Sequence, residues 1–172
     1  MTHIQPEHYT IIPAKPDHST GIEIILDEAF GLDRRMKSSY RLREGSTPLD
    51  GLSFAAELDG ELVGSIQFWP IMIGRSTNAL LLGPLAVLPV YQGVGLGMAL
   101  IGKGLNAARA KGHSLVVLVG DEPYYGRAGF RPFDERSVGL PGPYDPDRVL
   151  YVELEEGAAK GISGLILPPH RI

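Results

Sequence analysis

Near the N-terminus, hydrophobic positions first follow a strand pattern and then recur at helical spacing. Tyr9–Pro13 predicts a short strand, and the residues after it predict a helix that begins at Pro16 or Asp17 and ends near Gly31. A second helix is expected over residues 33–42, because its first residue is an aspartate that can cap it. The apolar positions of the first helix are Ile22, Ile25, Leu26 and Ala29.

Two strand-like segments joined by an Asp-Gly pair predict a β-hairpin. Leu52–Leu58 and Leu62–Ile73 flank Asp59-Gly60, a dipeptide that favours a two-residue turn. Beyond the hairpin, an apolar strand from Leu80 leads through a glycine-rich loop into a helix from about Val94 to Ala110. This strand, loop and helix form the central unit of the predicted structure.

Shorter segments toward the C-terminus predict two further strands, Val116–Val119 and Arg148–Glu155. Strands and helices therefore interleave after a mostly antiparallel start, which predicts an α/β (α+β) fold with a mixed, largely antiparallel central sheet flanked by helices. The length of 172 residues suits one domain, which we place at residues 1–156, followed by a C-terminal extension at 157–172.

The composition is that of an ordinary globular domain, with 44% hydrophobic and 21% charged residues. A net charge of -4, with no basic run longer than Arg34-Arg35, argues against a nucleic-acid partner. The chain has no cysteine, so it has no disulfide framework, thiolate metal site or cysteine nucleophile, and we expect no metal. Its first residues lack the pattern of a secretion signal, so a cytoplasmic location is expected.

The segment from Leu80 to Gly102 is the most informative, because it is apolar, rich in glycine and free of charge. A membrane span needs about 20 apolar residues, but prolines and glycines interrupt a continuous helix here, so we expect no membrane partner. A strand that feeds a glycine-rich loop at a helix N-terminus can instead bind phosphate through backbone N–H groups. The loop fits neither the G-x-G-x-x-G fingerprint nor the P-loop, which disfavours a nucleotide-dependent oxidoreductase.

Two motifs carry a resemblance to a known family. The run Gln92-Gly93-Val94-Gly95-Leu96-Gly97 resembles the Q-x-x-G-x-G motif with which the GNAT superfamily of N-acyltransferases binds acyl-CoA. Further on, Tyr125 and Gly129-Phe130 match the Y-x-x-x-G-F spacing of the second GNAT signature. With Arg34-Arg35 and the L-R-x-G run at Leu42–Gly45, the chain looks like the YhbS-like branch of predicted acetyltransferases, over roughly residues 9–154.

The resemblance implies a sheet splayed at an acyl-CoA site, acetyl-CoA as co-substrate and a primary amine as acceptor. The backbone N–H of Leu85 would polarise the thioester carbonyl, and Tyr125 would act as general acid toward the departing thiolate. Neighbouring Tyr124 is the alternative acid. The residues expected to contact acetyl-CoA are Leu85, Ala86, Val87, Gln92, Gly93, Val94, Gly95, Leu96, Gly97, Met98 and Tyr125.

The chain also departs from the family pattern. Many relatives place a glutamate base four residues before the polarising amide, where this chain has Leu81. Candidates by location for the base are Glu57, Asp121 and Glu122, and each has a surface charge as its alternative reading. The loop lacks the basic residues of many relatives, so backbone amides would carry more of the phosphate binding, with help from Lys103 or Arg127 if either reaches the cofactor.

The acceptor is less constrained. In the family, the first two helices and the region after the tyrosine recognise it, which here are Arg34, Arg35, Tyr40, Arg41 and the loop Pro141–Pro146. Arg34 and Arg35 could attract an acidic acceptor or belong to a solvated helix face, and Trp69 could line the pocket or lie in the core. We expect a small-molecule or peptide amine, and a homodimer is possible. The competing hypothesis is a non-catalytic acyl-CoA-binding or interaction module.

Overall fold

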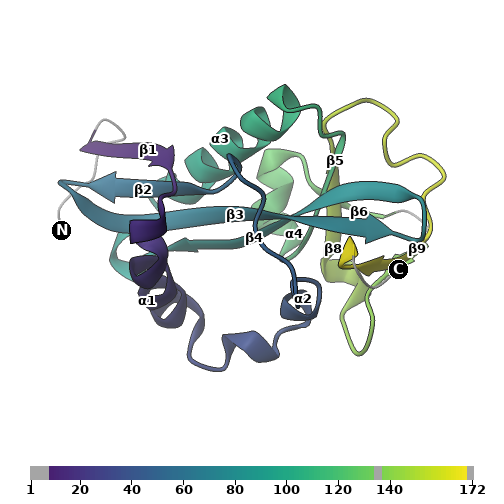
Figure 1. Ribbon diagram of the computed structural model, residues 1–172, viewed down its shortest axis with the longest axis horizontal. Coiled ribbons are helices and arrows are strands. Elements are labelled where there is room, and N and C mark those ends of the chain that lie inside the picture. Colours follow the sequence, from purple (N-terminus) through teal and green to yellow (C-terminus); the bar gives the residue numbers. More distant parts are fainter. Residues whose placement is uncertain (1–7, 134–136, 170–172) are drawn as a thin grey trace.

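The computed structural model describes residues 8–133 and 137–169 as one open sheet with helices on both faces (Figure 1). The strand order is β1-β2-β3-β4-β5-β8-β6, and β9 pairs with β3 and with β7. The strands are β1 (Tyr9–Pro13), β2 (Phe54–Leu58), β3 (Glu61–Ile73), β4 (Thr77–Val87), β5 (Leu115–Val119), β6 (Arg131–Pro132), β7 (Val138–Gly139), β8 (Val149–Glu153) and β9 (Gly164–Leu167).

Neighbouring strands run antiparallel except at β4–β5 and β7–β9, so the predicted mixed, largely antiparallel fold class is confirmed. The α-helices are α1 (Ser19–Phe30), α2 (Ser38–Arg41), α3 (Leu96–Ala110) and α4 (Glu122–Tyr125). Short 3-10 turns complete the chain: η2 (Pro16–His18), η3 (Arg34–Met36), η4 (Pro89–Tyr91), η5 (Gly126–Ala128) and η6 (Pro146–Arg148).

Helices α1 and α3 cover opposite faces of the central strands. Ile22, Ile25 and Leu26 of α1 pack on Ala86 of β4. The larger hydrophobic cluster, beneath α3, contains Leu100 and its neighbours in the helix together with side chains of β2, β3, β4 and β5. Alternate positions of one strand therefore serve both helices, as the two-residue period of a strand requires.

The hairpin turn is confirmed in detail. Asp59 and Gly60 both have positive φ, at 52° and 81°, as a two-residue turn of type I′ requires, and they join β2 to β3. The first helix ends at Gly31, whose φ is 88°, as the sequence predicts.

Two helix predictions are wrong in their extent. The second helix, expected over residues 33–42, is divided into η3 and α2, because Lys37 has an extended backbone between them. Helix α3 begins at Leu96 and not at Val94, because Gly95 adopts the left-handed conformation that ends a loop and not one that continues a helix.

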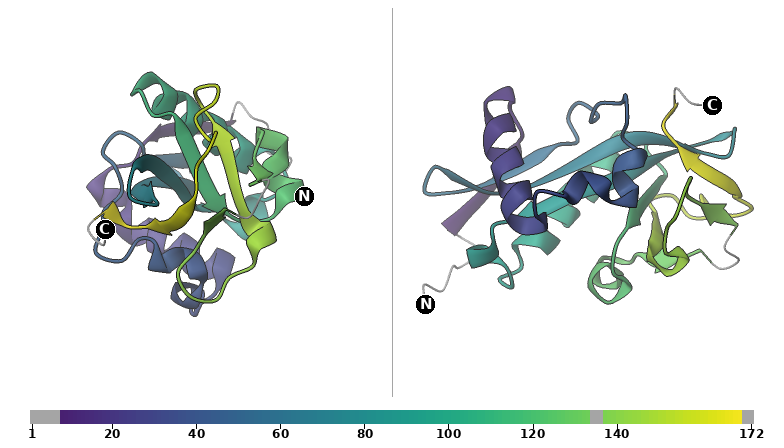
Figure 2. Two further views of the ribbon diagram at one scale, coloured as in Figure 1. Left: turned by 90° about the vertical axis from the view of Figure 1, so that its right-hand side faces the viewer. Right: turned by 90° about the horizontal axis from the view of Figure 1, so that it is seen from below.

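The segment after residue 156, expected as an extension, adds a strand to the sheet. β9 pairs Leu167 with Met72 and Ile166 with Ile73 of β3, and the Ile166 side chain is fully buried. In Figure 1, β9 lies with β5 and β8 at the end of the sheet opposite β1, and the left view of Figure 2 faces this end. Residues 170–172 of the expected extension lie outside the described residues.

Close packing of α3 on β3 gives a stability prediction. A Cβ at Gly104 would approach Cζ of the fully buried Phe68 to 2.6 Å, whereas a Cβ at Gly102 of the same helix meets nothing within 4 Å. We expect Gly104→Ala to lower the free energy of unfolding by about 1–2 kcal/mol, because overpacking outweighs the gain in helix propensity. Gly102→Ala should raise it by up to about 1 kcal/mol. Urea unfolding tests both variants, and equal effects would contradict the packing.

Candidate active site

A cavity of about 530 Å³ lies where β4 and β5 separate. The parallel ladder between them pairs Leu80 with Val116 and Leu81 with Val117, and no later pair is formed although both strands continue. Among the described residues, the β5-facing edge of β4 beyond Leu81 therefore has no strand partner, and its polar backbone groups border the cavity.

A bulge in β4 determines which side chains face this cavity. Ile66 pairs with Leu85 and Phe68 with Leu82, so two residues of β4, Gly83 and Pro84, oppose one residue of β3. The extra residue inverts the alternation of the strand. As a result Leu85 and Val87 line the cavity, while Ala86 packs beneath α1.

The start of α3 supplies a second group of backbone donors. The first intrahelical bond runs from the amide of Ala99 to the carbonyl of Gly95 at 3.0 Å. The amides of Leu96, Gly97 and Met98 therefore have no acceptor within the helix, and no side chain caps this end. Together with the positive end of the helix dipole, these amides favour a bound anion.

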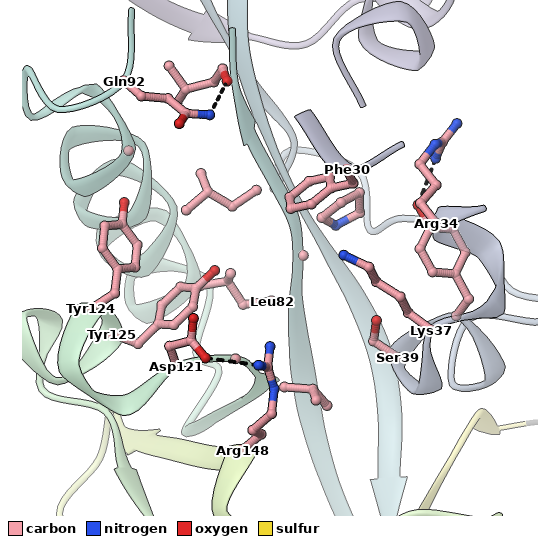
Figure 3. A pocket seen from close by; sticks show the side chains of 18 of the residues that line it. Phe30, Arg34, Lys37, Ser39, Leu82, Gln92, Asp121, Tyr124, Tyr125 and Arg148 are labelled. Atoms are coloured by element: carbon pink, nitrogen blue, oxygen red, sulfur yellow. Dashed lines mark hydrogen bonds and ion pairs between the residues drawn. The ribbon is translucent and has the colours of Figure 1, made fainter. Parts of the chain in front are cut away.

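The glycine-rich loop is held against the end of β4. The Nε2 of Gln92 donates to the carbonyl of Val87 at 3.0 Å, across the loop (Figure 3). Gly93 and Gly95 have φ of 82° and 89°, which residues with a Cβ rarely adopt. At Gly97, a Cβ would collide with the Tyr124 hydroxyl, so glycine is needed for the close approach of α4 to α3.

The structure brings most of the predicted acyl-CoA residues to one cavity. Lining it are Leu85, Val87, Gln92, Gly93, Gly97 and Tyr125. The remaining five do not line it: Ala86 and Leu96 are buried in the core, Met98 is partly buried against it, and Val94 and Gly95 are exposed beside the loop. The side chains of Ala86, Leu96 and Met98 therefore serve packing, and Val94 and Gly95 face solvent.

Two adjacent tyrosines of α4 line the cavity. Their rings meet edge to face at 4.9 Å between centroids, and Tyr125 makes a similar contact with Phe130 at 6.1 Å. Burial raises the pKa of Tyr125 to about 12, with further increases from Tyr124 and Asp121 and an opposing effect of Arg148. Burial also raises the pKa of Tyr124. Both phenols are therefore neutral hydrogen-bond donors at physiological pH.

Of the three candidate bases, the structure places one at the cavity. Among the described residues, Asp121 is the one carboxylate that lines it, and its Oδ1 accepts from Arg148 at 2.9 Å (Figure 3). Glu57 instead pairs with His18 at 2.9 Å on the far side of β2. Glu122 borders a shallower surface groove outside the cavity. Leu81, at the position of the family's glutamate, is 1% exposed in the core.

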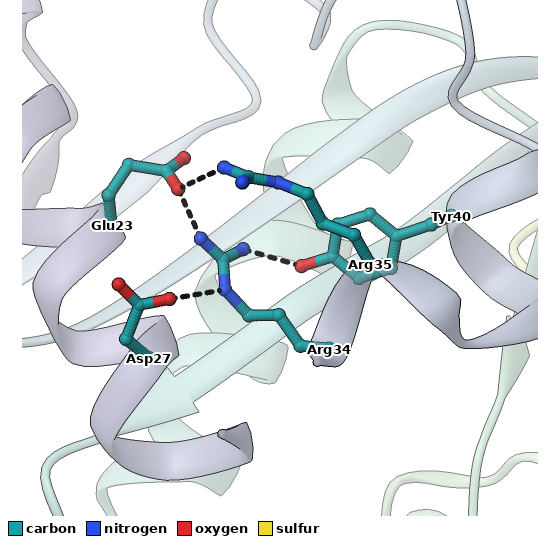
Figure 4. A network of polar contacts seen from close by, with 5 residues as sticks. All are labelled: Glu23, Asp27, Arg34, Arg35 and Tyr40. Atoms are coloured by element: carbon teal, nitrogen blue, oxygen red, sulfur yellow. Dashed lines mark hydrogen bonds and ion pairs between the residues drawn. The ribbon is translucent and has the colours of Figure 1, made fainter. Parts of the chain in front are cut away.

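Arg34 is neither a free cation nor part of a solvated helix face. It is 3% exposed, and its guanidinium donates to Asp27 at 2.9 Å, to the Tyr40 hydroxyl at 2.6 Å and to Glu23 (Figure 4). Burial alone would lower its pKa, but these hydrogen bonds raise it well above the usual value. Arg35 is exposed and shares Glu23. The pair therefore holds η3 to α1, although Arg34 also lines the cavity.

Two cations that the sequence analysis did not single out line the cavity on the side of α1 and α2. Lys37 has its Nζ 4.6 Å from the centre of the Phe30 ring. Arg43 is 9% exposed, and its Cζ lies 4.3 Å from the centre of the Tyr40 ring. Burial lowers the pKa of Arg43. The available signal was the L-R-x-G run, which contains this arginine.

Of the residues proposed for acceptor recognition, Tyr40 also lines the cavity, whereas Arg41, the 141–146 loop and Trp69 do not, and neither do the proposed phosphate ligands Lys103 and Arg127. Arg41 donates to the carbonyl of Pro143, so it joins the 141–146 loop to α2 beside a separate small pocket. Trp69 does not line the cavity and packs against the second core cluster. Lys103 and Arg127 are exposed and do not line it either, although Arg127 lies 5.9 Å from the centre of the Tyr124 ring.

Comparison with known proteins identifies the family of this chain. A profile described as "Acetyltransferase (GNAT) family" matches residues 21–130, which spans α1 to the end of the Tyr125–Phe130 motif. The chain belongs to the GNAT family of acetyltransferases. Among its relatives is the uncharacterized N-acetyltransferase YjhQ of Escherichia coli, 33% identical over 140 residues, covering 80% of this chain and 77% of that protein.

Solved GNAT structures agree with the fold. The GNAT family N-acetyltransferase YhbS from Escherichia coli, crystallised with CoA, superposes with a TM-score of 0.81 at 28% identity, covering 97% of this chain and 93% of that chain. A GNAT family acetyltransferase from Brucella melitensis, crystallised with acetyl-CoA, gives a TM-score of 0.63 at 31% identity over 84% of this chain and 96% of that chain. The GNAT resemblance in the sequence is thus confirmed.

Residues 8–133 and 137–169 contain neither a candidate membrane span nor a candidate metal-binding cluster. No helix in these ranges is long and apolar enough to cross a membrane. No group of three or more His, Cys, Asp or Glu side chains there could hold a metal ion.

The Arg34 network gives a prediction that separates buried from exposed ion pairs. We expect Arg34→Met to lower the free energy of unfolding by about 1–3 kcal/mol, because it removes several charge-assisted hydrogen bonds from a buried position. Arg35→Met removes a side chain that is 71% exposed and should cost less than about 1 kcal/mol. Thermal unfolding of both variants measures the difference, and equal losses would contradict a special role for Arg34.

Proposed function

We propose that this protein transfers an acetyl group from acetyl-CoA to a primary amine by direct attack of the amine on the thioester. The observation that carries the proposal is that one cavity holds the open edge of β4 at Leu85, the uncapped start of α3 and the phenol of Tyr125. The GNAT relatives crystallised with CoA and acetyl-CoA support the choice of co-substrate.

The residues present suit an acyl-CoA molecule. Its pyrophosphate would accept hydrogen bonds from the amides at the start of α3, where the positive φ of Gly93 and Gly95 brings the backbone close. Its amide-containing arm would pair with the open edge of β4 at Leu85–Val87, as an added strand does. Acetyl-CoA would supply the acyl group as an activated thioester.

Leu85 would contribute its backbone N–H to the carbonyl oxygen of the thioester. Negative charge builds on this oxygen when the amine attacks, and a donor fixed in advance stabilises that charge more than it stabilises the ground state. A single donor of this kind contributes about 10²–10³ in rate. The bulge at Gly83–Pro84 fixes the direction of the donor, because it decides which way the strand presents residue 85.

Tyr125 would donate to the sulfur as the carbon–sulfur bond breaks. With a pKa of about 12 it stays protonated throughout the physiological range. Complete transfer of its proton to a thiolate of pKa about 8.5 is uphill by about 5 kcal/mol, so the driving force must come from formation of the amide bond. A phenolate could not donate, so ionisation of Tyr125 would lower kcat. Because its pKa is about 12, this loss should not be seen at pH values up to about 10.

Replacement of each tyrosine tests this assignment. We expect Tyr125→Phe to lower kcat by about 10²-fold with little change in the KM for acetyl-CoA, because only the donor to the sulfur is lost. Tyr124→Phe is the matched control. It should mainly raise the KM for acetyl-CoA, because the Tyr124 hydroxyl lies beside Gly97 in the first turn of α3. Steady-state thiol release measures both, and a larger kcat loss in Tyr124→Phe would reverse the assignment.

The attacking amine must lose a proton, and Asp121 is our candidate to receive it, through water if it does not touch the amine. It is the carboxylate that lines the described part of the cavity wall. We expect Asp121→Asn to lower kcat about 10²-fold at neutral pH and by less at alkaline pH, where more amine is already neutral.

Arg148→Gln is the control for this prediction. It breaks the same ion pair but keeps the carboxylate, so it should retain most of the activity if Asp121 accepts the proton. Equal losses in both variants, with parallel pH profiles, would show that the pair acts structurally and that solvent takes the proton.

A second candidate function is a non-catalytic acyl-CoA-binding module, favoured by the buried leucine at position 81. It predicts tight CoA binding by calorimetry with no thiol release from acetyl-CoA for any amine, peptide or aminoglycoside. Release with one acceptor that is abolished in the Tyr125→Phe variant would exclude it.

A further inference from the structure

Arg43 is a buried cation that is paired with no carboxylate of the described residues. It is 9% exposed, and none of the ion pairs among the described residues includes it. Arg43 hydrogen-bonds the Tyr40 side chain and, at a long 3.4 Å, the Ser39 hydroxyl, and its Nε has no partner. A buried charge without a counter-charge is costly, so an unpaired guanidinium in a cavity indicates an anionic ligand.

The other cations of the cavity make the contrast clear. Arg34 is neutralised by Glu23 and Asp27, and Arg148 by Asp121. Arg43 and Lys37 line the same cavity and contact aromatic rings, but neither is in an ion pair within the described part of the chain. Within residues 8–133 and 137–169, this side of the cavity therefore carries two positive charges without an ion-pair partner, of which Arg43 is buried and Lys37 exposed.

Arg43 is also held in a defined orientation. Its guanidinium carbon lies 4.3 Å from the centre of the Tyr40 ring and 5.8 Å from that of Trp69. Such contacts restrict the planar guanidinium, whose paired donors match the two oxygens of a carboxylate.

The location of Arg43 connects it with the reaction. One of its terminal nitrogens lies 3.6 Å from where a Cβ of Gly83 would be, and Gly83 is two residues before Leu85 in the bulge. Lys37 and Ser39 approach from the same side of β4, opposite Gln92, Tyr124 and Tyr125 (Figure 3). An anion bound to Arg43 would thus be separated from the expected CoA region but close to the reacting carbonyl.

We infer that the acceptor is an amine that also carries a carboxylate, and that Arg43 binds this carboxylate and thereby positions the amine for attack near Leu85. The inference rests on the proposed function and narrows its substrate class to amino acids and related amino-carboxylates. It replaces Arg34 and Arg35, the acidic-acceptor candidates of the sequence analysis, with a residue that the fold leaves without a counter-charge.

The test compares acids with their uncharged amides. Thiol release from acetyl-CoA is measured with glycine, β-alanine, 4-aminobutyrate and 6-aminohexanoate, each beside its primary amide, so that only the carboxylate charge differs. At the best chain length we expect kcat/KM for the acid to exceed that for the amide by about 10- to 100-fold. In Arg43→Gln this ratio should fall to about one, and in the exposed control Arg35→Gln it should be retained.

A binding measurement keeps the test independent of turnover and of folding. With CoA present, propanoate should raise the melting temperature of the wild type more than propanamide does, and this difference should disappear in Arg43→Gln. The variant is used only if its CoA affinity shows that it is folded, and otherwise Arg43→Lys replaces it, with an expected partial loss of the ratio.

The outcomes separate the two proposals. Turnover that does not distinguish acids from amides, or a ratio that survives in Arg43→Gln, would overturn the carboxylate site and leave acetyl transfer intact. Arg43-dependent binding of propanoate without turnover of any amine would support the anion site and overturn acetyl transfer. Absence of both would overturn both.

Discussion

The separation of β4 from β5 is the constraint on which the rest of the site depends. Two parallel pairs, ending at Leu81 and Val117, hold the halves of the sheet together, and everything beyond them is open on one side. A paired strand would have its backbone donors satisfied by the sheet, whereas this edge keeps them available to a ligand. The cavity, the accessible backbone at Leu85 and the approach of α4 all follow from this separation.

Charge is distributed unevenly around that opening. Ion pairs join carboxylates to Arg34 and Arg148, whereas no ion pair among the described residues includes Arg43, which is one of the better-buried cations of this part of the chain. The expected CoA side differs, because its loop has no charged side chain. An anion bound there would be held by backbone amides and the helix dipole. Under the two proposals above, the two halves of the cavity would recognise their ligands by different means, side-chain charge on one side and backbone on the other.

Local signals in the sequence were sufficient for much of the fold. The Asp59-Gly60 turn, the end of α1 at Gly31 and the fold class follow from residue type and period, and the structure has them as predicted. The break at Lys37 and the burial of Arg34 could not be predicted, because they depend on carboxylates of α1 that meet η3 only after folding. The position of Asp121 at the cavity, and not Glu57, likewise depends on strand order.

The bulge at Gly83–Pro84 has a consequence for how this site can change in evolution. Because the group presented at position 85 is a main-chain N–H, its direction depends on the number of residues in the strand and not on which side chain stands there. Nineteen of the twenty amino acids retain that N–H, and only proline lacks it. A substitution at position 85 would change the packing of this side chain at the cavity wall but keep the N–H, whereas loss of one residue at the bulge would exchange the two faces of the strand end, turning Ala86 toward the cavity.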